Sequence, residues 1–89
     1  MKSILTVIGK DQVGIIAGIS NELSKFNINI LSVNQTIMDG YFTMMMMLEQ
    51  SEANSSFEDV KKALSIKGQE LKVDIKIQRE DIFTSMHTL

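Results

Sequence analysis

The sequence predicts an α+β domain in which a four-stranded antiparallel sheet has two helices on one face and a short helix at its carboxyl end. The hydrophobic period switches along the chain in the order strand, helix, strand, strand, helix, strand. An Asp-Gly pair separates the second and third strand segments, which is a strong hairpin signal. The first and third strand segments are apolar on both faces, as central strands are, and the fourth alternates like an edge strand. This βαββαβ order is that of the ferredoxin-like fold, with strand order 4-1-3-2.

The first strand leads into a helix through a glycine-rich stretch. Residues 3–8 are apolar and rich in β-branched side chains, and Gly9 is expected to end this strand. After Gly14 the apolar residues follow a helical period on one face: Ile15, Ile16, Ile19, Leu23 and Phe26. Asp11 precedes the first turn, where its carboxylate can cap the helix. Gly18 is expected to let this helix pack closely on its neighbours.

The next two segments predict a hairpin. Residues 28–38 and 41–50 flank Asp39-Gly40, and a type I′ turn requires positive φ at both central positions. Four consecutive methionines, residues 44–47, lie in the second of these strands. Because successive strand side chains point to opposite faces, only alternate methionines share a side. No His or Cys joins them in the run, so we interpret them as flexible core side chains and not as a copper site.

The second helix and the last strand follow a polar loop. Ser55 and Glu58 have capping-box spacing, and Gly68 is expected to end the helix. The inward side chains of this helix are expected to be Phe57, Val60 and Leu64. Residues 71–78 alternate apolar and polar side chains, which predicts a strand with one solvated face.

Residues 80–89 form an amphipathic tail after residues 1–79. A helical stripe of apolar side chains predicts a short helix: Ile82, Phe83, Met86 and Leu89. Two helices cover only one face of a sheet, so the tail is a candidate cover for the second face, either in its own chain or on a partner. His87 is the single histidine, and we expect it to lie on the surface or pack within the tail.

Composition excludes several classes of function. A chain of 89 residues forms one domain with a thin core, so oligomerisation is an expected source of further buried area. The net charge of −2 and the scattered basic residues argue against nucleic acid, and no apolar run is long enough for a membrane span. The absence of cysteine fits a reducing compartment, so we expect a soluble cytoplasmic protein without a metal or cofactor.

No catalytic motif is visible. None of the serines lies in GxSxG, and the loop GKDQVG matches neither a phosphate loop nor a dinucleotide fingerprint. The same loop lacks the anion-binding arginine that an acylphosphatase on this topology would need. We therefore expect a protein that is not an enzyme.

Residues 4–46 resemble an ACT domain, the small ligand-binding module attached to many enzymes of amino-acid metabolism. The specific features are a strand, then D-x-x-G-I-(I/V) opening a helix, then the turn N-I-N-I into the next strand. The resemblance covers residues 1–79, and the tail EDIFTSMH is similar to that of stand-alone single-ACT proteins of bacteria, an uncharacterised group akin to glycine-cleavage regulators.

The resemblance implies a homodimer, formed side by side through the first helix and second strand, that binds a small effector at the interface. It implies ligand contacts at Asp11, Gly14 and Asn29, the last from the neighbouring chain. An amino acid needs an acceptor for its ammonium group, which Asp11 supplies, and donors for its carboxylate, which the N–H groups around Gly14 and Ile15 supply. Val13 replaces the proline common before this glycine, which leaves the loop less rigid.

Two functions remain open at this point. The first is a regulatory module that senses an amino acid as a homodimer. The alternative is a protein interaction or dimerisation module with no small ligand, which docks through an edge strand or the tail. For Asp11, a helix cap and a ligand contact are both compatible with the sequence.

Overall fold

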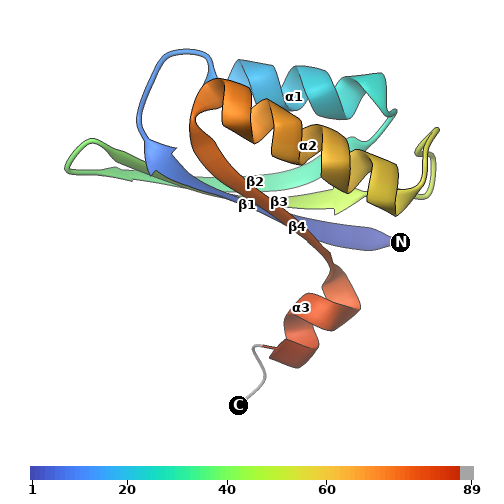
Figure 1. The fold of residues 1–89 in the computed structure, drawn as a ribbon. Coiled ribbons are helices and arrows are strands. Elements are labelled where there is room, and N and C mark those ends of the chain that lie inside the picture. The colour runs from blue at the N-terminus through green and yellow to red at the C-terminus, as the bar shows by residue number, and fades with distance from the viewer. Residues whose placement is uncertain (87–89) are drawn as a thin grey trace.

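The computed structural model describes residues 1–86 as one sheet with two helices on one face and a third helix on the other (Figure 1). The elements, in chain order, are β1 (Lys2–Lys10), α1 (Ile15–Lys25), β2 (Asn29–Met38), β3 (Tyr41–Glu49), α2 (Phe57–Leu71), β4 (Val73–Arg79) and α3 (Glu80–Met86). The strand order is β2-β3-β1-β4, and every neighbouring pair is antiparallel. The predicted ferredoxin-like topology and order 4-1-3-2 are confirmed.

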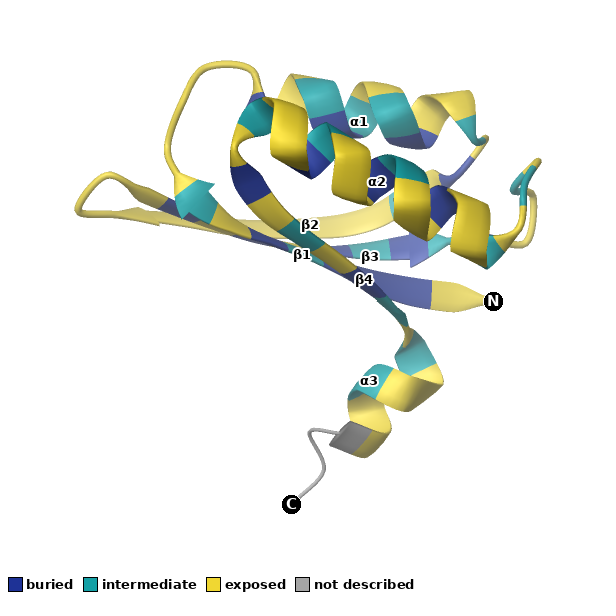
Figure 2. Ribbon diagram, viewed as in Figure 1, coloured by how far each residue is buried: buried dark blue, intermediate teal, exposed yellow. Residues whose placement is uncertain are grey.

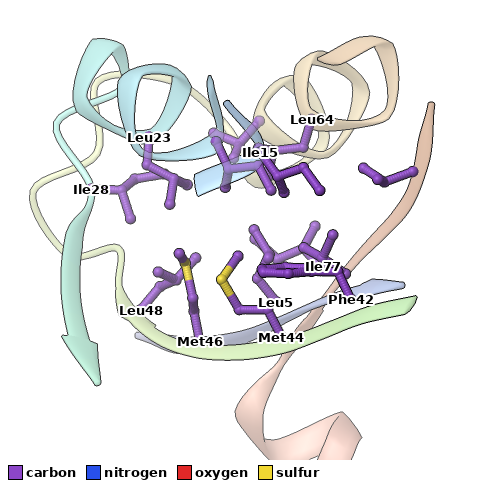
Figure 3. Packing of buried hydrophobic residues seen from close by; sticks show 14 residues of the cluster. Leu5, Ile15, Leu23, Ile28, Phe42, Met44, Met46, Leu48, Leu64 and Ile77 are labelled. Atoms are coloured by element: carbon purple, nitrogen blue, oxygen red, sulfur yellow. The ribbon is translucent and has the colours of Figure 1, made fainter. Parts of the chain in front are cut away.

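The core lies between the sheet and the two helices (Figure 3). Alternate side chains of the two central strands point into it: Leu5, Val7, Phe42, Met44, Met46 and Leu48. The helices contribute Ile15, Ile19, Leu23, Val60 and Leu64 from above. Met44 and Met46 are fully buried, whereas Met45 points to the opposite face and is exposed, so alternate methionines fill the core as predicted.

The turn between β2 and β3 has the backbone that its sequence predicts. Asp39 has φ 51° and Gly40 has φ 79°, which are the two positive values that a type I′ turn requires. Cross-strand pairing then runs without a gap from Met38 opposite Tyr41 to Ser32 opposite Met47, and an irregularity follows at Leu31. The predicted hairpin is confirmed.

Helix boundaries differ from the expectations in two places. Gly14, not Asp11, is the residue that caps α1, so the expected cap by Asp11 is wrong. The cap of α2 is Ser56, whose hydroxyl accepts a hydrogen bond of 3.2 Å from the N–H of Asp59, so the expected box starting at Ser55 is displaced by one residue. Both helices therefore begin slightly later than their capping patterns indicated.

Two glycines are also placed differently from the expectation. Gly68 does not end α2, because the helix continues to Leu71 and Lys72 takes the left-handed conformation that stops it, with φ 60°. A side chain at Gly68 would bring its Cβ within 2.8 Å of the carbonyl oxygen of Val73. Gly68 therefore provides space for α2 to approach β4. Gly9 likewise lies inside β1, beside Val73, and does not end the strand.

Helix α3 continues from the end of β4 and extends downward on the side of the sheet opposite α1 and α2 (Figure 1). It contacts β1 and β4, and its half-buried Phe83 lines a groove together with Ile4, Ile8 and Met45. Ile82 remains exposed, so only part of the predicted apolar stripe faces the sheet. His87 and Leu89 lie outside the described residues. Within residues 1–86, no helix has the length and hydropathy needed to cross a membrane.

We predict that Gly68→Ala lowers the free energy of unfolding by about 1 to 3 kcal/mol, since the added Cβ meets backbone that cannot rotate away. This loss opposes the gain of about 1 kcal/mol that alanine brings to a helix interior. Gly18→Ala is the matched control, because its Cβ would meet only the flexible tip of Leu71, at 3.1 Å. Urea denaturation should show Gly18→Ala unchanged or more stable. Equal stability of the two variants would contradict this account of Gly68.

Candidate functional site

The loop between β1 and α1 is tied to two other parts of the molecule. The N–H of Asp11 donates a hydrogen bond of 2.8 Å to the carbonyl of Gly40 in the hairpin turn. The side-chain amide of Gln12 donates to the carbonyl of Leu71 at the end of α2. The carboxylate of Asp11 is exposed and forms no hydrogen bond or ion pair with another residue of the described chain. The loop is therefore held by its backbone and by Gln12, which leaves the Asp11 carboxylate available to a ligand.

The start of α1 presents backbone donors to solvent. Gly14 has φ 96° and ψ −2°, and no side chain caps the helix there. Its carbonyl accepts the first helical hydrogen bond, of 2.9 Å, from the N–H of Gly18. Apart from Gly14 itself and its two neighbours in the chain, no residue of the described part of the chain has an atom within 4 Å of the place where a Cβ at Gly14 would be. The first N–H groups of the helix, beginning with Ile15, are thus accessible to an anion.

The four residues with predicted ligand contacts fall into two places. Asp11, Gly14 and Ile15 lie together at the hairpin end of the sheet, and the Ile15 side chain is only 2% exposed, so its N–H group alone can meet a ligand. Asn29 lies opposite Glu49, which also pairs with Lys2 at the start of β1. Eight residues of β1 therefore separate the two places, which is about 26 Å in a strand. A single chain does not bring Asn29 to the other three.

Asn29 borders a groove that runs along the outer side of α1. The groove has a volume of about 350 Å³ and is lined by Ser20, Ser24, Asn27, Ile28, Asn29 and Ile30. Sequence reasoning missed Ser20 and Ser24, although their spacing of four residues places both on one side of a helix. The spacing of the two serines does not indicate that the first residues of β2 lie next to Ser20 and Ser24 in the fold. Asn27 holds the turn between α1 and β2, since its amide donates to the carbonyl of Glu52 at 3.0 Å.

Strand β2 is an exposed edge without charges. It contains no Asp, Glu, Lys or Arg, and Leu31, Val33 and Ile37 are 45%, 48% and 55% exposed (Figure 2). Ile16 was expected in the core, but it lies on the adjoining outer side of α1 and is also exposed. We call the surface formed by these four residues the α1/β2 side.

The opposite edge strand of the sheet, β4, differs from β2 because it carries charged side chains. β4 carries Asp74, Lys76 and Arg79, and charges of this kind hinder pairing with another strand. The contrast singles out the α1/β2 side as the edge that is suited to association. Among residues 1–86, no three His, Cys, Asp or Glu side chains gather in a way that could hold a metal ion.

Comparison with known proteins gives consistent results. The family model of the ACT domain matches residues 3–78. The UPF0237 protein of Listeria innocua is 61% identical over 89 residues, and the alignment covers all of both chains. The solved structure of an ACT domain protein from Streptococcus pneumoniae superposes with a TM-score of 0.81 at 41% identity, covering 93% of each chain.

A more distant structure shares the fold. The regulatory subunit of aspartate kinase from Thermus thermophilus superposes with a TM-score of 0.68 at 18% identity, over 86% of this chain and 50% of that chain. At this identity the similarity concerns the fold alone.

We predict that Gly14→Ala lowers the free energy of unfolding by about 1 to 2 kcal/mol, because an L side chain is strained at φ 96°. The added methyl group meets open space, so the loss reflects the backbone conformation and not a steric clash. Val13→Ala is the control, since the Val13 side chain is fully exposed and its removal should leave stability unchanged. Urea denaturation of both variants measures the difference. A Gly14→Ala variant as stable as Val13→Ala would show that α1 can begin without the left-handed residue.

Proposed function

This chain belongs to the ACT domain family, and we propose that it is a non-catalytic regulatory module that binds an amino acid as a homodimer. ACT domains are regulatory modules that bind small molecules. In this proposal residues 1–79 form the ACT domain and residues 80–89 an appended tail. A chain without cysteine is also compatible with the cytoplasmic location that we propose.

The observation that supports this proposal most directly is that the Asp11 carboxylate, which has no partner among residues 1–86, lies in the loop that leads into the open start of α1. An α-amino acid has an ammonium group that needs acceptors and a carboxylate that needs donors. Asp11 offers the acceptor, and the N–H groups following Gly14 offer donors reinforced by the helix dipole. The two groups belong to one loop that is fixed to the hairpin and to α2, so their relative position is largely set before a ligand arrives.

A symmetric dimer would complete this site with Asn29. In this dimer, the two-fold axis is normal to the sheet and passes beside the middle of β2. It places the hairpin end of one chain's sheet next to the opposite end of the second chain's sheet. Asn29 of the second protomer then approaches the end that carries Asp11 and Gly14. The same axis joins the α1/β2 sides of both chains, which removes their exposed apolar side chains from water. One arrangement thus accounts for the uncharged edge and for the separation of the predicted contacts.

The alternative is a dimerisation module without a small ligand. The α1/β2 side favours it, because the exposed Leu31, Val33 and Ile37 give a reason to associate whether or not an effector is present. The two functions share the interface and differ in whether Asp11 has a role in binding.

We predict that one of the twenty amino acids raises the melting temperature by several degrees and that Asp11→Ala abolishes this shift. A ligand at about 100 times its Kd adds roughly 2.7 kcal/mol to the free energy of unfolding, which moves the melt of so small a domain by several degrees. Glu58→Ala removes an exposed carboxylate from the first turn of α2 and should keep the full shift. A shift retained in Asp11→Ala would show that the site is elsewhere, and no shift with any amino acid would favour the alternative.

We predict that Val33→Lys and Ile37→Lys each halve the mass of the particle in solution, measured by light scattering. Both side chains are about half exposed in the single chain, so lysine is tolerated by the fold but adds an unpaired charge to the proposed interface. Ile66→Lys is the matched control, since Ile66 is 52% exposed on α2, away from this edge. An unchanged mass in both β2 variants would remove the α1/β2 side as the dimer interface.

A further inference from the structure

The groove beside α1 is lined by side chains that form hydrogen bonds but carry no charge. Two of them are hydroxyls and two are amides, and they lie beside two isoleucines: Ser20, Ser24, Asn27, Asn29, Ile28 and Ile30. The volume of about 350 Å³ is at the lower end of the range for small-molecule sites, which is roughly 300 to 1,000 Å³. The groove therefore suits a short polar group.

Three of these side chains keep their hydrogen-bonding groups free. Ser20, Ser24 and Asn29 form no side-chain hydrogen bond with any residue in the part of the chain that the structure describes. Asn27 differs, because its amide donates to the carbonyl of Glu52 at 3.0 Å. A hydroxyl both donates and accepts, and so does an amide. The groove can therefore give a hydrogen bond to a polar ligand group and also receive one from it.

The charged side chains of α1 lie on the other side of the helix. Glu22 pairs with Lys25 at 3.4 Å and with Lys67 of α2 at 3.9 Å. The backbone carbonyls of residues 23–26, at the end of α1, all accept hydrogen bonds from within the chain. The groove thus offers a charged ligand group neither a counter-ion nor the free carbonyls of a helix end.

In the proposed dimer the two copies of α1 run antiparallel across the α1/β2 side. Each α1 begins at the hairpin end of its sheet and ends at the turn before β2. The two-fold axis therefore places Ser24 and Asn29 of one chain next to Gly14 of the other, and Ser20 lies nearer to the axis. An effector held by Asp11 and by the N–H groups after Gly14 would then have the groove of the second chain within reach of its side chain.

We propose that Ser20, Ser24 and Asn29 of the second chain form the pocket for the effector's side chain, and that the effector is an amino acid with a hydroxyl or amide side chain. This pocket rests on the amino-acid-binding dimer proposed above. A site built to hydrogen-bond a polar group rejects an analogue without it, because its own donors and acceptors are then left unpaired. A charged side chain would lose hydration without gaining a counter-ion. Serine, threonine, asparagine and glutamine are the candidate effectors.

Titration calorimetry with amino acids of similar size tests the class of effector. Serine and alanine differ by one hydroxyl, threonine and valine have nearly the same shape, and asparagine and glutamine are compared with leucine. We expect one hydroxyl or amide amino acid to bind about tenfold or more tightly than its apolar counterpart, and aspartate and lysine to bind still more weakly. An apolar or charged amino acid as the tightest ligand would overturn the pocket.

The double variant Ser20→Ala with Ser24→Ala tests the two hydroxyls. Alanine is the best helix former, so α1 should be preserved. We expect the affinity for the hydroxyl or amide effector to fall about tenfold, and the affinity for its apolar counterpart to change by less than about twofold. Ser65→Ala is the matched control, since Ser65 is exposed on α2. An unchanged affinity for the effector, or an equal loss for both ligands, would contradict the role of these serines.

Mixed dimers test whether the second chain supplies the pocket. Asp11→Ala and the double serine variant each damage both sites of their own homodimer. When the two variants are unfolded and refolded together, every mixed dimer has one site with both changes and one site with neither. We expect about a quarter of all sites to regain the wild-type affinity. No recovery would overturn the assignment of Asp11 and the two serines to different chains.

The same variants separate the pocket from the proposed function. If an apolar or charged amino acid binds and Asp11→Ala abolishes its binding, the pocket fails while the amino-acid-binding function stands. If a hydroxyl or amide amino acid binds to Asp11→Ala as tightly as to the wild type but weakly to the double serine variant, the pocket stands while the role of Asp11 fails. If no amino acid binds, both are overturned.

Discussion

The antiparallel pairing of β1 with β3 is the interaction on which the rest of this structure depends. It places these two strands at the centre of the sheet, where the buried Leu5 lies opposite Met46 and the buried Val7 opposite Met44. These side chains form the floor on which α1 and α2 pack. The same register sends β1 out of the sheet beside the hairpin turn, so that the loop carrying Asp11 can bond to Gly40. The core and the candidate site are thus consequences of one strand alignment.

Much of this fold could be predicted from the sequence because its signals are local and strong. The alternation in β4, the apolar centre of β3 and the Asp-Gly turn each specify an element, and together they leave one common topology. Helix boundaries were less predictable because several residues compete for each cap. Ser55 and Ser56 are both suitable caps by residue type, and in the structure the hydroxyl of Ser56 accepts the hydrogen bond from the N–H of Asp59. Gly68 looked like a helix stop, yet tertiary packing against β4 uses its small size instead.

The candidate site was only partly accessible to sequence reasoning. The motif around Gly14 indicated an open helix start, and the structure shows one. The position of Asn29 relative to that start depends on strand register and, in the dimer that we propose, on a second chain, neither of which appears in a local pattern. The groove beside Ser20 and Ser24 likewise arises from the packing of α1 next to the first residues of β2, which lie several positions later in the chain.

The uncharged edge of β2 also has a consequence for the single chain, before the association that we propose takes place. β2 has ten successive residues without a charge or a proline, and half of them are apolar. An edge strand of this kind can pair with any extended segment of another chain. A newly made or diluted chain therefore carries a site for misassembly in the same strand that we propose for recognition. A higher concentration of this protein in the cell then has two opposite effects. It promotes the proposed pairing of two folded chains, and it also promotes collisions between the exposed β2 edge and unfolded chains. Any condition that keeps this edge uncovered in the presence of unfolded chains would favour aggregation over function.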